Sequence, residues 1–77
     1  METKLYLRNI GNNIKEIRKS QGVSQSQLAH MCNFEKSNLS RIEAGNTNLT
    51  LKTLLKLANS LNVDPFELCE TKSRLKN

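Results

Sequence analysis

The 77-residue sequence contains no tryptophan, one histidine and only two cysteines. Cys32 and Cys69 form no C-x-x-C pair and fit no zinc-finger spacing, and His30 alone cannot complete a set of metal ligands. Both cysteines occupy apolar helical positions, where small buried hydrophobic residues are expected. The sequence shows no nucleophile–base pair, paired carboxylates or metal cluster, so we expect neither an enzyme nor a cofactor or metal site.

Long hydrophobic runs are also missing. No segment approaches the roughly 18 apolar residues of a membrane span, and the opening residues METKLYLRNI lack the apolar core of a signal peptide. We therefore expect a cytoplasmic protein with no membrane partner. No run alternates between apolar and polar residues over the length of a strand, so no sheet is expected. One tyrosine and two phenylalanines are too few for a base-stacking platform, which argues against single-stranded RNA as a ligand.

Length and charge bound the function further. A chain this short forms one domain with a limited core. Its 12 lysines and arginines against 7 acidic residues give a formal net charge of +5. Such an excess on a small body attracts polyanions. On charge alone, nucleic acid and an anionic membrane surface are the candidate partners, and a soluble basic protein without a polyanionic partner is the alternative.

Apolar residues recur at intervals of three and four, which predicts helices throughout. We expect five: from about residue 4 to 20, 25 to 32, 35 or 36 to 44, 51 to 61, and from 65 onward. Gly11 weakens the first helix by up to about 1 kcal/mol relative to alanine. The segment before Gly11 could therefore form a separate turn.

Residues at the expected helix ends match known capping preferences. Ser24, Thr50 and Asp64 are predicted N-caps, and the first and last of these have Gln or Glu three residues later, which predicts capping boxes. Asn33 and Asn62 tolerate the left-handed backbone conformation and can end the second and fourth helices.

The second and third expected helices are short and are joined by a turn at Asn33 and Phe34. Two such helices, the second with a polar outer face, form a helix-turn-helix, which presents its second helix to the major groove of DNA. Leu39 and Ile42 are expected to hold that helix to the core. The polar residues expected on the opposite face or its flanks are Lys36, Ser37, Ser40 and Arg41.

The stretch VSQSQLAHMCNFEKSNLSRIEAG, followed by a leucine-rich helix and NVDPFEL, resembles the Cro/CI (Xre-type) helix-turn-helix family. The motifs S-Q-x-x-L-A, S-x-I-E-x-G and L-x-x-L-L-x-L-A carry the resemblance, whereas Asn33 replaces the commoner glycine of the turn. The resemblance implies an all-α, five-helix lambda-repressor-like bundle. It would form a single domain over residues 1–77, with a core of about 10–68 and a frayed tail at 70–77.

The resemblance also implies roles for individual residues. Arg18 and Glu43 would form an ion pair that clamps the first helix to the third, with a surface pair as the alternative. The expected base-reading residues are Lys36, Ser37, Ser40 and Arg41, with Asn38 as a further candidate. The expected phosphate contacts are Gln25, Asn46, Thr47, Asn48 and Lys52. For Gln25 the alternative is a solvated residue at the start of a helix. For the loop of residues 46–48 the alternative is a plain turn.

One small module makes few base contacts, so we expect a homodimer that reads an inverted repeat. Leu57 and Leu68 are expected to lie off the main apolar stripes and to form an exposed patch with the C-terminal helices. The expected function is a sequence-specific regulator of transcription that binds a double-stranded DNA operator, of the phage-type repressor or restriction–modification controller type. Its activity would depend on its own concentration or on an unknown protein partner. The alternative is an antitoxin-type protein or a protein-interaction module with the same fold.

Overall fold

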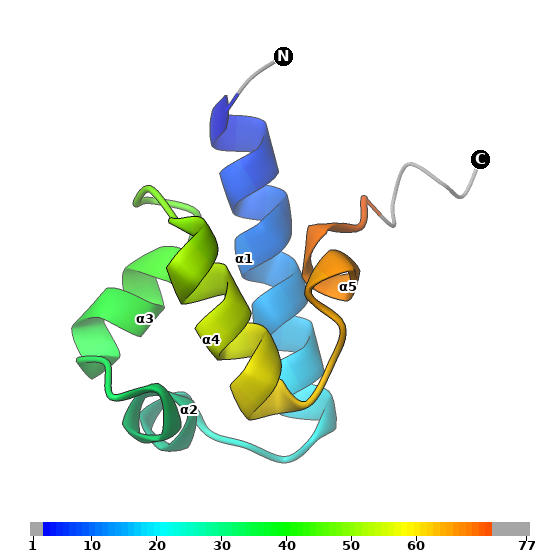
Figure 1. Ribbon diagram of the computed structural model, residues 1–77. Coiled ribbons are helices and arrows are strands. Elements are labelled where there is room, and N and C mark those ends of the chain that lie inside the picture. Colours follow the sequence, from blue (N-terminus) through cyan, green and yellow to red (C-terminus); the bar gives the residue numbers. More distant parts are fainter. Residues whose placement is uncertain (1–2, 72–77) are drawn as a thin grey trace.

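The computed structural model describes residues 3–71, which form five helices and no strand (Figure 1). The helices are α1 (Thr3–Ser20), α2 (Gln25–Cys32), α3 (Lys36–Glu43), α4 (Leu51–Leu61) and α5 (Pro65–Cys69). The predicted all-α class and helix order are confirmed. The part of the expected frayed tail at 72–77 lies outside the described residues. None of the helices within residues 3–71 combines the length and apolar character needed to cross a membrane.

The helix ends follow from local sequence. Ser24 Oγ accepts the backbone N–H of Gln27 at 3.0 Å, and the Gln27 side chain accepts the N–H of Ser24 at 2.8 Å. Asp64 caps α5 in a second capping box. Asn33 and Asn62 end α2 and α4 with φ of 60° and 58°. The predicted capping boxes and both left-handed stops are confirmed. They can be predicted from sequence because they depend on residues only a few positions apart.

Apolar side chains from all five helices meet in one core. Its fully buried larger members are Ile14, Leu28, Leu39, Leu57, Leu61 and Leu68. α1 packs against α3 and α5, while α4 packs against α2 and α5. As Figure 1 shows, α3 and α2 lie on one side of this assembly and α5 on the other. Helix α3, the second helix of the motif, is therefore supported from behind by the rest of the bundle.

Two expectations about leucines are wrong. Leu57 and Leu68 are both fully buried, so they form no exposed patch. The buried side of α4 is centred between Leu54, Leu57 and Leu61, because α2 and α5 cover that side. The side chain of Leu55 is 45% exposed.

The interior polar residue Asn13 ties the two ends of the fold together. Its Nδ2 donates to the carbonyl oxygens of Leu68 at 2.9 Å and Glu70 at 2.7 Å, and Asn9 Nδ2 also donates to Glu70 O at 2.7 Å. These bonds satisfy carbonyl groups at the end of α5, which has no further turn whose N–H groups could donate to them. No pattern in the sequence predicted this anchor.

The cysteines differ in environment. Cys32 is buried, and its S–H donates to Ser60 Oγ at 3.2 Å. Cys69 is only partly buried, and desolvation by burial raises the pKa of its thiol. The expectation of buried cysteines is therefore confirmed for Cys32 and only partly met by Cys69.

Candidate nucleic-acid interface

α3 has one buried face and one exposed face. Leu39 and Ile42 are 0% and 5% exposed and fix the helix on the core. The predicted base-reading residues all lie on the exposed part of the helix: Lys36, Ser37, Ser40 and Arg41. Asn38 is half-buried beside them. Within residues 3–71 the one ion pair is Arg18–Glu43, so neither cation of α3 is neutralised by a described acidic residue.

The turn before α3 has a defined geometry. The N–H of Asn33 donates to His30 O at 3.1 Å and the N–H of Phe34 donates to Ala29 O at 2.8 Å. This pairing of the last carbonyls of α2 is typical of a helix that ends in a left-handed residue. The half-buried Phe34 packs against the core, and Lys56 Nζ lies 5.4 Å from its ring centroid. The turn is therefore fixed at both its backbone and its side chain, which sets the direction of α3.

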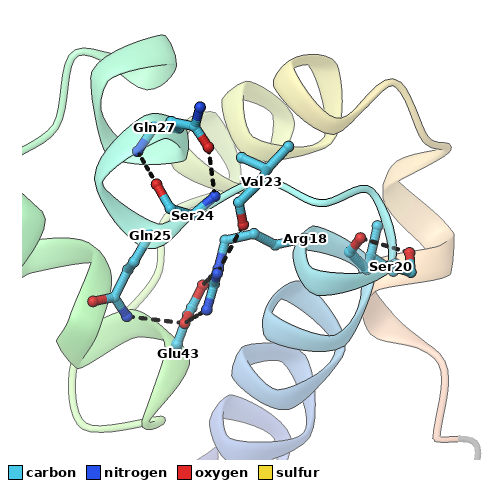
Figure 2. Close-up of polar contacts among 8 residues, drawn as sticks. Arg18, Ser20, Val23, Ser24, Gln25, Gln27 and Glu43 are labelled. Atoms are coloured by element: carbon cyan, nitrogen blue, oxygen red, sulfur yellow. Dashed lines mark hydrogen bonds and ion pairs between the residues drawn. The ribbon is translucent and has the colours of Figure 1, made fainter.

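The other end of α3 is held by a buried carboxylate (Figure 2). Arg18 Nε lies 2.8 Å from Glu43 Oε2, and Arg18 Nη2 donates to Glu43 Oε1 at 3.1 Å. Arg18 Nη1 also donates to Val23 O at 2.9 Å. The two charged side chains are 9% and 4% exposed. The structure thus brings the predicted pair together in a two-point contact between α1 and the last residue of α3.

Gln25 joins the same network from α2. Its Nε2 donates to Glu43 Oε1 at 3.0 Å, as Figure 2 shows. One amide N–H is thereby committed to the carboxylate, and a primary amide carries a second N–H donor. Gln25 is also the first residue of α2, where free backbone N–H groups favour anions. No local pattern predicts the bond to Glu43, because the two residues are 18 positions apart.

The loop after α3 carries the remaining predicted phosphate contacts. Asn46, Asn48 and Lys52 are exposed, and Thr47 is half-buried. Residues 45–48 also line an open hollow that they share with Thr3, Lys4 and Leu7 of α1. No group of three histidine, cysteine or acidic side chains that could hold a metal ion occurs within the described residues.

A short helix with an anchored apolar face and a free cationic face, set by a tight turn and a buried clamp, suits the major groove of duplex DNA. The fold and this site define a small all-α DNA-binding module. Residues 14–68 match the family model described as helix-turn-helix. The chain belongs to this helix-turn-helix family. It is accordingly a DNA-binding transcriptional regulator and not an enzyme.

Individual relatives agree with the family. The chain is 34% identical over 59 residues to the uncharacterized HTH-type transcriptional regulator y4dJ of Sinorhizobium fredii, with 77% of each chain covered. The crystal structure of the restriction-modification controller protein C.AhdI from Aeromonas hydrophila is similar, with a TM-score of 0.78 and 35% identity over 80% of this chain and 94% of that one. The biofilm regulator SinR in complex with DNA is similar with a TM-score of 0.73 and 39% identity, over 79% of this chain and 98% of that one.

Proposed function

We propose that the protein binds an inverted-repeat operator in double-stranded DNA as a homodimer and regulates transcription there as a repressor or a restriction–modification controller. The observation that carries the proposal is the placement of Lys36 and Arg41. Both are exposed on α3, while its opposite face is buried. The likeness to C.AhdI supports the controller type. We also propose that the protein acts in the cytoplasm.

In this proposal α3 enters the major groove. Arg41 and Lys36 donate to the O6 and N7 acceptors of guanine, the commonest specific contact of such side chains. Ser37 and Ser40 contribute less specific contacts, because a hydroxyl can donate to one base and accept from another. The proposed phosphate contacts fix the register of the protein on the duplex. They are Gln25, Asn46, Thr47, Asn48 and Lys52.

The homodimer would form through the C-terminal helices. Their exposed apolar side chains are Leu51, Leu55 and Phe66, at 69%, 45% and 79% exposure. These replace Leu57 and Leu68, which are buried, as the proposed contacts. A two-fold dimer places its recognition helices roughly 34–36 Å apart, one turn of DNA, and so favours an inverted repeat.

Binding to duplex DNA as a function of salt tests the proposal. A duplex selected by the protein from a random pool is compared with an unselected duplex of equal length. Arg41→Ala should cost about 1–3 kcal/mol on the selected duplex and relax discrimination, because it removes a base contact. Lys52→Ala is the matched control and should weaken both duplexes alike.

The same titration separates the alternatives. A protein-interaction module that has kept only the fold would show no binding that weakens steeply with salt. Such a result would contradict the proposal. If Arg41→Ala, like Lys52→Ala, weakens binding to both duplexes alike, only base reading by α3 is contradicted. The protein would then be a DNA binder without sequence preference.

A further inference from the structure

Four basic residues of α1 lie along one side of the helix. Lys4, Arg8, Lys15 and Lys19 are all exposed. They follow one another at spacings of four, seven and four residues, close to whole numbers of helical turns. No acidic residue occurs between residues 3 and 15. The N-terminal part of this side of α1 is therefore uniformly cationic.

The N-terminal end of this stripe adjoins the loop after α3. A Cβ atom on Gly45 would lie 2.6 Å from the Cα of Arg8, so the loop and the α1 backbone are in direct contact. Lys4 and Leu7 line the open hollow whose other side is Gly45, Asn46, Thr47 and Asn48. In Figure 1 the first turns of α1 rise beside the loop that joins α3 to α4.

We propose that Lys4 and Arg8 bind phosphates of the DNA backbone and extend the contact made by residues 46–48 onto α1. The inference rests on the proposed DNA binding. An ammonium and a guanidinium form strong charge-assisted hydrogen bonds with phosphate. The amide and hydroxyl groups across the hollow add neutral donors of the kind that contact phosphate oxygens. Both residues lie N-terminal to the segment 14–68 that matches the family model.

The contact carries no base information, so it should act equally on all duplex sequences. Removal of one phosphate contact should reduce the slope of log K against log salt by about 0.9. Lys4→Gln/Arg8→Gln should therefore reduce the magnitude of that slope by about 2 on selected and unselected duplexes alike. Glutamine keeps most of the aliphatic stem that packs against the loop and removes only the charge.

The experiment measures this slope with purified full-length protein and one unselected duplex longer than the footprint. Lys15→Gln/Lys19→Gln is the matched control, since it removes the same charge from the same side of the same helix, away from the loop. It should keep the wild-type slope. Lys4→Arg/Arg8→Lys should also keep it, because the charges remain. Thermal unfolding of each variant checks that the fold is intact.

Three outcomes decide the inference. A reduced slope in Lys4→Gln/Arg8→Gln alone supports it. An unchanged slope in that variant, or an equal reduction in the control, overturns it, even while the wild-type protein binds and Arg41→Ala loses discrimination. Absence of salt-dependent binding by the wild-type protein overturns the proposed function itself, and the inference with it.

Discussion

Gly11 of α1 lies against Ile42 of α3 so closely that a Cβ atom on the glycine would lie 2.3 Å from the Ile42 carbonyl oxygen. The Glu43 carbonyl oxygen would lie only 2.6 Å away. The backbones of α1 and α3 are therefore in direct contact beside Glu43, the residue that pairs with Arg18. The glycine that weakens α1 locally allows this approach, and α1 continues through it as one helix. The suggested separate turn before Gly11 is wrong.

Gly11→Ala should destabilise the protein, although alanine is the better helix former. Overpacking costs about 1–3 kcal/mol, which exceeds the gain in helix propensity of up to about 1 kcal/mol. The free energy of unfolding in urea measures the net effect. Asn12→Ala is the control, because this neighbouring side chain is exposed and its substitution brings the propensity gain without the clash. Equal or higher stability of Gly11→Ala would show that the two helices can separate at little cost.

Glu43→Ala should destabilise the protein by about 3–5 kcal/mol, because it leaves the Arg18 guanidinium buried without its partner. It also removes the acceptor of the Gln25 amide. Glu16→Ala is the matched surface control and should change the unfolding free energy by less than about 1 kcal/mol. Equal destabilisation by the two variants would show that the ion pair does not clamp α1 to α3. The double variant Arg18→Met/Glu43→Leu should recover part of the stability, since no unpaired charge remains.

Asn13→Leu should cost about 1–3 kcal/mol, because the Leu68 and Glu70 carbonyl groups lose a buried donor. The substitution should also speed the exchange of backbone amide hydrogens with solvent, and should do so more in α5 than in α3. Asn9→Leu serves as the control, since Asn9 is less buried and makes one bond to Glu70. If both variants lose the same unfolding free energy and the amide hydrogens of α5 stay protected from exchange, the hydrogen bonds of Asn13 do not hold α5 in place.

Local sequence predicted the parts of the fold that depend on residues a few positions apart. The capping box at Ser24, the left-handed stops at Asn33 and Asn62, and the exposed polar face of α3 are of this kind. Each is set by backbone geometry within one or two turns, so its residue types are visible without knowing the fold.

The features that local sequence did not predict depend on residues far apart in the chain. The Asn13 contacts span 55 and 57 positions, and the close approach at Gly11 depends on where α3 docks. The prediction for Leu57 was wrong because helical spacing gives an apolar stripe but not its centre. The centre is set by α2 and α5, which both pack against α4.

Phe66→Glu and Leu68→Ala separate the proposed dimer surface from the core. Phe66 is 79% exposed and Leu68 is fully buried, although they are two residues apart in α5. Phe66→Glu should leave the monomer folded, because it removes little buried area, and should shift the protein from dimer to monomer in sedimentation equilibrium. Its unfolding midpoint should no longer rise with protein concentration, as that of an associating protein does.

Leu68→Ala should instead lower the free energy of unfolding by about 2–5 kcal/mol, because it leaves a cavity among α1, α4 and α5. Circular dichroism and urea unfolding at one protein concentration compare the two variants. A wild-type protein that is monomeric throughout would contradict the proposed dimer. A dimer that survives Phe66→Glu would place the interface elsewhere on the surface, since a charge introduced into an apolar contact between subunits is costly unless it finds a partner.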